Sequence, residues 1–176
     1  QTYFGLHSRK RTFSRQFKPI KCESEDSVND MAQCDECQGY LNPALAGDAC
    51  VRRGDDILLV QRKFPPSAGS WVLPGGFVDQ GERPEEAVLR ELSEEAGLEG
   101  RHPRLLMVMG DPQRDPRKHI VSIVYEVDAE GEPKGGDDAQ DARFWPISDI
   151  LEGRLVLAGD HGEIVERWLN QSIQNQ

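Results

Sequence analysis

The sequence predicts a domain that mixes α-helices with β-strands, in the α+β or α/β class. Apolar runs with the composition of strands precede one helical segment, further strand-like runs follow it, and an amphipathic helix closes the chain. At 176 residues, the chain has material for one domain of usual size and a small appendage. We place the boundary at Pro43, because a residue before proline is driven out of the helical region. This gives an N-terminal arm, residues 1–42, and a folded domain, residues 43–176.

The first two strands are expected on either side of a tight turn. Residues 44–52 and 57–61 are strand-like, and Gly54-Asp55-Asp56 between them is a typical hairpin turn. The run from Ile57 to Val60 is continuously apolar rather than alternating, which favours a strand buried on both faces.

A glycine pair follows the next strand, which begins at Trp71. Pro74, Gly75 and Gly76 are expected to end this strand in a turn that leaves room for another group to approach closely. A loop then leads into a helix. Its first turn accepts Pro84, because a missing N–H costs nothing there, and Gly97 supplies the left-handed residue that ends it.

This helix is amphipathic and acidic. Glu91, Glu94 and Glu95 are three and four residues apart, which predicts three carboxylates on one exposed ridge. Like charges at this spacing cost about 0.2–0.5 kcal/mol of helix stability for each close pair. Mg²⁺ or Mn²⁺ would offset that cost, because hard cations bind carboxylate oxygens and phosphates together. A solvated acidic helix is the alternative. The apolar face is expected to consist of Val88, Leu89, Leu92 and Ala96.

Two neighbouring residues fit such a metal site. Gly75 can add a backbone carbonyl to the ligands. Arg90 directly precedes Glu91 and can pair with Glu82 or Glu86, which would hold the preceding loop against the helix.

The spacing of these residues resembles the signature of the Nudix hydrolase family. Gly76 is followed after five residues by Glu82, and after seven more by the run from Arg90 to Leu98, Arg-Glu-Leu-Ser-Glu-Glu-Ala-Gly-Leu. Every fixed position of the signature is present. The resemblance implies an α/β/α sandwich with a mixed central sheet, and metal-dependent hydrolysis of a nucleoside diphosphate linked to another moiety. It implies metal ligation by Gly75, Glu91, Glu94 and Glu95, and catalysis by Arg90, Glu94 and Glu95.

After the helix, residues 105–109 and 120–127 are apolar enough to be strands. The loop between them carries Arg114, Arg117 and Lys118, which can present positive charge to a phosphate; a solvated loop is the alternative. The loop resembles that of ADP-ribose pyrophosphatases, which implies water attack on a phosphorus of ADP-ribose to give AMP and ribose 5-phosphate. Alternative substrates are NADH, FAD, a nucleotide sugar and capped RNA. A non-catalytic ADP-ribose sensor is a further alternative.

Aromatic residues are candidates for the nucleobase site. Trp71, Phe77 and Phe64 can stack on adenine, or they can belong to the core instead.

The resemblance also implies a general base in the polar segment of residues 130–141, before the last strand. Asp137, Asp138 and Asp141 are candidates, and we select Asp138.

The chain is expected to end in a strand and a helix. Residues 142–147 form the predicted strand, and Asp160 with Glu163 predicts a capping box at the start of the helix. The apolar face of that helix would consist of Ile164, Val165, Trp168 and Leu169.

The charge balance bears on partners and location. A net charge of −10 argues against nonspecific binding to nucleic acid. Residues 1–20 hold five cations and no acid, which resembles part of an organelle transit sequence; a solvated arm is the alternative. No apolar run is long enough to span a membrane, so we expect a cytoplasmic protein, with a mitochondrial or other organelle matrix as the alternative.

The N-terminal arm contains a candidate zinc segment. Cys34-Asp-Glu-Cys37 has the spacing of a zinc knuckle, but no second such pair exists to complete four ligands. The segment resembles the second knuckle of the zinc ribbon found before some Nudix domains, with Cys22 and His7 as replacements for a degenerate first knuckle. Structural Zn²⁺ is therefore a hypothesis, with free thiols as the alternative. The family resemblance also suggests a homodimer, with the arm as a crossing element.

Overall fold

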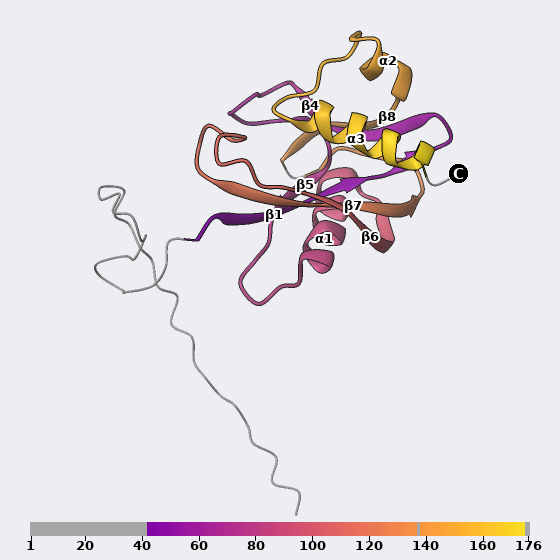
Figure 1. Ribbon diagram of the computed structural model, residues 1–176. Helices are drawn as coiled ribbons and strands as arrows, with labels where there is room; N and C mark the ends of the chain where they lie inside the picture. The colour runs from indigo at the N-terminus through magenta and orange to yellow at the C-terminus, as the bar shows by residue number, and fades with distance from the viewer. Residues whose placement is uncertain (1–41, 137, 175–176) are drawn as a thin grey trace, which may run out of the picture. The chain divides into compact units, whose positions relative to one another are not determined.

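The structure is a computed structural model that describes residues 42–136 and 138–174. Its elements, in chain order, are β1 (Ala44–Cys50), β2 (Arg52–Arg53), β3 (Asp56–Arg62), β4 (Trp71–Val72), β5 (Gly75–Phe77), α1 (Pro84–Ala96), β6 (Glu99–Met109), β7 (Ile120–Glu130), β8 (Ala139–Pro146), α2 (Ile147–Leu151) and α3 (His161–Gln174) (Figure 1). The predicted mixture of strands and helices is confirmed.

The strands form two four-stranded sheets. The first has the order β5-β1-β7-β6 and is mixed, because β1 and β7 run parallel whereas the outer pairs are antiparallel. In the second, β3 pairs antiparallel with β2, β4 and β8. Figure 1 shows α1 on one side of the strands and α3 on the other. The expected α/β/α sandwich with a mixed sheet is therefore observed.

Strand β3 is buried on both faces, as its continuous apolar run predicts. Leu58 and Val60 belong to the core that packs against α1, whereas Ile57 and Leu59 belong to the core that packs against α3. Successive side chains of a strand point to opposite faces, so one strand supplies both cores. The predicted apolar faces contribute Val88, Leu92 and Ala96 from α1 and Ile164, Val165 and Trp168 from α3.

The predicted hairpin is wrong in its pairing. The turn at Gly54 does reverse the chain, but it joins β3 to the two-residue strand β2, with Arg52 opposite Ile57. Strand β1 instead lies between β5 and β7 in the other sheet. A turn signal fixes where the chain reverses, but it does not fix how far the pairing extends from the turn.

The glycine pair lies in a strand rather than in a turn. Gly75 and Gly76 open β5, which pairs antiparallel with β1, with Gly75 opposite Asp48. A Cβ atom on Gly75 would collide with Asp48, and one on Gly76 would collide with the carboxylate of Glu91. The expectation of a close approach is therefore correct, and glycine is needed because other groups occupy the space of a side chain.

Helix α1 begins and ends where the sequence predicts. Pro84 is its first residue, and Gly97 follows it with a φ of 66°. The predictions of three other elements were wrong or incomplete. Strand β6 begins at Glu99 rather than at residue 105, β8 begins at Ala139 rather than at residue 142, and the short helix α2 was not predicted. The added part of β6 is polar and largely exposed, so it lacks the apolar run that predicts a strand.

Several predictions concern residues outside the described ranges. They include zinc binding by Cys22, Cys34 and Cys37, the arm as a transit or crossing segment, and the candidate base Asp137. The domain boundary, the homodimer and the location remain predictions. Within the described ranges, no helix combines the length and apolar character needed to span a membrane.

Candidate active site

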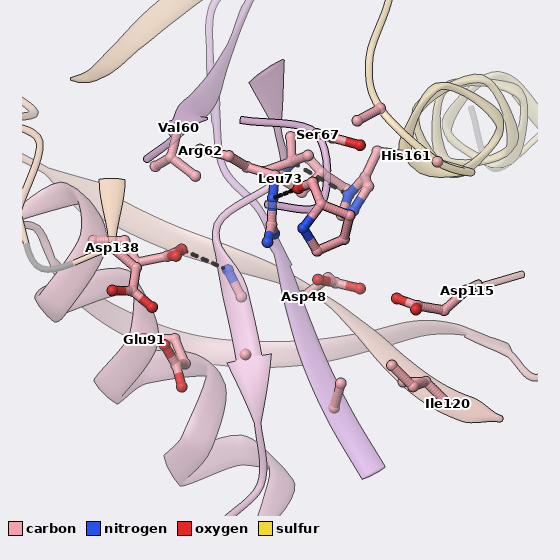
Figure 2. A pocket seen from close by; sticks show the side chains of 18 of the residues that line it. Asp48, Val60, Arg62, Ser67, Leu73, Glu91, Asp115, Ile120, Asp138 and His161 are labelled. Atoms are coloured by element: carbon pink, nitrogen blue, oxygen red, sulfur yellow. Dashed lines mark hydrogen bonds between the residues drawn. The ribbon is translucent and has the colours of Figure 1, made fainter. Parts of the chain in front are cut away.

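A cavity of about 310 Å³ opens beside α1 and is lined by residues of β1, β3 and β5 and of the segment that leads into α3. Figure 2 shows how its polar residues are arranged, with Glu91 and Asp138 on one side and His161 and Asp115 on the other. A concave site where charged groups from distant segments converge is the usual form of a small-molecule site.

Two glutamates of α1 line this cavity. Glu95 accepts a hydrogen bond from the Gly75 amide at 3.0 Å, and burial raises its pKa to about 7. The neighbouring charges of Glu91 and Asp48 add to this increase. Burial also raises the pKa of Glu91, although Arg90 partly counters the effect. The cavity therefore concentrates negative charge that the protein only partly compensates.

Glu94 does not share this position. Its side chain is exposed, lies outside the cavity lining and accepts a hydrogen bond from Arg90 at 3.1 Å. The prediction of one exposed ridge is therefore wrong in its geometry. Glu91 and Glu95 are four residues apart and share a face of the helix. Glu94 is the direct neighbour of Glu95, so it is rotated by about 100° away from it at 3.6 residues per turn.

Arg90 joins the acids to the loop before the helix. Its Nε and Nη2 donate to the carboxylate of Glu82 at 2.9 and 3.0 Å, which confirms one of the two expected pairings. Its Nη1 donates to Glu91 at 2.7 Å, and its Nη2 also donates to the carbonyl of Phe77 at 3.0 Å. Arg90 does not line the cavity, so it holds the Glu91 carboxylate from the side that faces away from the cavity.

The cavity has the donor chemistry of a divalent cation site. Within residues 42–136 and 138–174, no three acidic, histidine or cysteine side chains are arranged to hold a metal ion as they stand. Arg90 and the Gly75 amide hold the carboxylates of Glu91 and Glu95 in the present arrangement. However, Glu91, Glu95 and Asp48 face one cavity and supply only hard oxygen ligands, which suits Mg²⁺ or Mn²⁺. These residues fit such an ion if their side chains rotate toward it.

Sequence reasoning missed two polar residues of the cavity, one buried and one half-buried. Asp48 is almost fully buried on β1 and accepts a hydrogen bond from the hydroxyl of Ser122. An aspartate within an apolar strand was a usable signal. His161, the first residue of α3, accepts a hydrogen bond from the Leu73 amide at its Nδ1 atom, at 3.3 Å. Burial lowers the pKa of His161. No local sequence pattern distinguishes this histidine.

The arginines of the loop between β6 and β7 are already paired. Arg114 makes a bidentate contact with Asp160, at 2.7 and 2.8 Å, and only 9% of its side chain is exposed. Arg117 does the same with Asp115, at 2.9 and 2.7 Å. Both arginines line the cavity, but neither presents a free guanidinium, and their binding of substrate stays a prediction. Because Asp160 contacts Arg114, its carboxylate is occupied outside the predicted capping box.

The aromatic candidates separate into two groups. Phe64 and Phe77 are exposed and line the cavity, and the ammonium of Lys118 lies 4.5 Å from the ring centroid of Phe77. Trp71 lies outside the cavity lining and packs edge-to-face against Trp145, with 5.2 Å between ring centroids. Phe64 and Phe77 therefore lie at the cavity, whereas Trp71 packs against the α3 core.

The candidate base Asp138 lies at the cavity. Its backbone carbonyl accepts a hydrogen bond from the Lys63 amide at 2.9 Å, which fixes the segment before β8 beside β3. Figure 2 shows its side chain on the same side of the cavity as Glu91.

Comparison with known proteins gives consistent results. A family model described as the NUDIX domain matches residues 43–168. An ADP-ribose pyrophosphatase from Methanocaldococcus jannaschii is 45% identical over 135 residues, which cover 74% of this chain and 78% of that protein.

Solved structures with the same fold include ligand complexes. The NUDIX domain of Shewanella oneidensis NrtR, complexed with ADP ribose, has a TM-score of 0.68 at 29% identity, and the match covers 75% of this chain and 90% of that one. A bifunctional NMN adenylyltransferase/ADP ribose pyrophosphatase from Francisella tularensis, complexed with AMP and a Mn ion, has a TM-score of 0.67 at 30% identity, with coverage of 74% and 42%.

Proposed function

The chain belongs to the Nudix hydrolase family, and from this premise we propose that it cleaves ADP-ribose to AMP and ribose 5-phosphate with the help of Mg²⁺ or Mn²⁺. The observation that carries the proposal is the cavity in which the Glu91 and Glu95 carboxylates lie together with exposed phenylalanines. The 45% identity to a protein named as an ADP-ribose pyrophosphatase supports this choice of substrate.

The α1 acids would hold the cation. Glu91 and Glu95, with Asp48 beside them, are the proposed ligands, and Gly75 can contribute its carbonyl. The bound ion would neutralise charge on the diphosphate and make water more acidic. Arg90 positions Glu91 through its 2.7 Å contact, and the Gly75 amide positions Glu95 while leaving the second carboxylate oxygen available.

The substrate would lie across the cavity between acids, cations and aromatic rings. Phe64 and Phe77 offer faces on which adenine can stack. Arg62 lines the cavity and donates from Nε to the Pro66 carbonyl at 2.9 Å. Among the described residues it forms no ion pair with an acid. Its guanidinium is thus a candidate contact for the diphosphate.

Asp138 is the proposed general base. A base must come within hydrogen-bond reach of the attacking water, and Asp138 lies at the cavity on the same side as Glu91. The carboxylate would remove the proton that the water loses when it attacks phosphorus.

Product analysis tests this function. The protein is incubated in Mg²⁺ or Mn²⁺ with ADP-ribose, NADH, FAD, a nucleotide sugar and capped RNA, and the products are separated by chromatography. We expect AMP and ribose 5-phosphate from ADP-ribose, with the highest kcat/KM of the set. A higher kcat/KM for another substrate would contradict the assignment. Calorimetric binding of ADP-ribose without turnover would favour the alternative of a non-catalytic sensor.

A further inference from the structure

His161 is held in one hydrogen-bonded state by the backbone of the cavity wall. The Leu73 amide donates to its Nδ1 atom at 3.3 Å. A ring nitrogen that accepts a hydrogen bond carries no proton, so the neutral imidazole must carry its proton on Nε2. Burial disfavours the doubly protonated, charged ring, which lowers the pKa and keeps this tautomer in place.

Among the side chains that the structure describes, in residues 42–136 and 138–171, the Nε2–H group of His161 has no acceptor. Across those ranges, Trp145 Nε1 is the one buried side-chain nitrogen or oxygen without a partner. If the Nε2 atom of His161 were both without a partner and buried, it would be a second such atom, and it is not. The Nε2 atom of His161 therefore reaches the open cavity that its side chain lines.

The two acids whose charges act on His161 do not accept a hydrogen bond from its Nε2–H group. The Asp48 and Asp160 carboxylates both act on the ring through their charge. Asp48, however, accepts from the hydroxyl of Ser122, and Asp160 makes its bidentate contact with Arg114. A polar donor at a cavity wall with no protein acceptor is suited to a ligand oxygen.

We propose that His161 binds the substrate, by donating a hydrogen bond from Nε2 to an oxygen of the nucleotide on the side of the cavity opposite Glu91 (Figure 2). This inference rests on the proposed function, because it assumes a nucleotide in this cavity. Phosphate oxygens and ribose hydroxyls share the required acceptor chemistry. The fixed tautomer makes the residue a neutral donor that is already oriented before the substrate arrives.

Two substitutions separate the two nitrogens of the ring. In His161→Asn, the amide oxygen lies near the former Nδ1 position and can still accept from Leu73, but the distant donor is lost. In His161→Gln, the longer side chain can return an N–H donor to the Nε2 position. We expect His161→Asn to raise KM for ADP-ribose roughly 10-fold, the value of one hydrogen bond to a charged or polar oxygen. We expect kcat to change little and His161→Gln to recover most of the loss.

The binding of products identifies the acceptor. Inhibition constants for AMP and for ribose 5-phosphate are measured with wild type and His161→Asn, and the weakened product contains the oxygen that His161 contacts. Unchanged KM and unchanged product inhibition in His161→Asn, with a wild-type melting temperature, would overturn the inference. A lower melting temperature with unchanged KM would also overturn it, by assigning the histidine a purely structural role.

Failure of the proposed function gives a different result. If the wild-type protein does not hydrolyse ADP-ribose, titration calorimetry with ADP-ribose replaces KM as the measurement. Weaker binding by His161→Asn than by wild type would then support the contact, whereas equal affinity would overturn it.

Discussion

The helix α1 and the loop between β6 and β7 both bring charged side chains to the cavity, but they differ in how the charges are compensated. In the loop, Arg114 is paired with Asp160 and Arg117 with Asp115, each through two hydrogen bonds. On the helix, Glu95 accepts only a backbone amide, and its pKa rises to about 7. The loop supplies its own counter-charges, whereas no ion pair to Glu95 is found among the described residues, which is why we propose a cation beside it.

The same contrast separates two adjacent residues of α1. Glu94 is exposed and paired with Arg90, whereas Glu95 is half-buried, and the charges of Glu91 and Asp48 act on it. Sequence adjacency gives these glutamates the same chemistry, and the helix rotation gives them different surroundings. The rotation of the helix, rather than membership of the acidic run, therefore decides which carboxylates face the cavity.

The largest expected effect comes from breaking the helix side of the comparison. Glu95→Gln should lower kcat on the order of 100-fold or more, because an amide cannot replace a carboxylate beside a divalent cation. Glu94→Gln should cost far less, because that carboxylate lies outside the cavity. Steady-state kinetics across a Mg²⁺ titration, with circular dichroism as the folding control, measures both. Equal losses in the two variants would show that the cavity geometry does not rank the acids.

The second expected effect comes from opening the loop side. Asp160→Asn leaves the Arg114 guanidinium, whose side chain is 9% exposed, without its counter-charge. Breaking a buried pair from one side costs about 3 kcal/mol of unfolding free energy, measured by urea denaturation. Asp115→Asn is the matched control, because its partner Arg117 is 44% exposed and such a pair contributes about 1 kcal/mol or less. A similar loss in both variants would remove the distinction between the two ion pairs.

The fold was largely predictable because its signals are local. The limits of α1 follow from Pro84 and Gly97, and the double burial of β3 follows from its apolar run. The pairing of β1 was not predictable in the same way. Strand partners are chosen by packing across the whole domain, and the turn at Gly54 is compatible with either a long or a short hairpin.

The site was predictable only where one segment contains it. Glu91 and Glu95 stand in one helix with a recognisable spacing, so sequence alone placed them together. His161 reaches the cavity from α3, 70 residues after Glu91 in the numbering, and nothing in its neighbourhood marks it. The partners of Arg114 and Arg117 were also missed, because an excess of cations in a loop does not show that acids elsewhere neutralise them.

The dependence of stability on pH tests the uncompensated charge of α1 without a change in the shape of the cavity. Folding raises the pKa of Glu95 from an ordinary value of 4.5 to about 7. Between these two values the folded state binds the proton more strongly than the unfolded state does, so stability falls as pH rises through this window. We expect a lower free energy of unfolding at pH 8 than at pH 5 in EDTA, and a smaller difference in Mg²⁺, because the cation favours the ionised carboxylate. Glu95→Gln should reduce the difference, and an unchanged slope in that variant would assign it to other groups.

The smallest expected effect tests whether the loop cations contact the substrate at all. Arg117→Gln should raise KM for ADP-ribose only about three-fold, with kcat unchanged, because a guanidinium already paired with Asp115 has little to offer a phosphate. Lys118→Met is the control: it removes the same charge from a residue outside the cavity lining that lies over Phe77. A larger effect for Arg117 than for Lys118 would indicate a direct contact. Equal effects would indicate that the loop contributes only long-range electrostatic attraction. An unchanged KM in both variants would leave the loop with a structural role only.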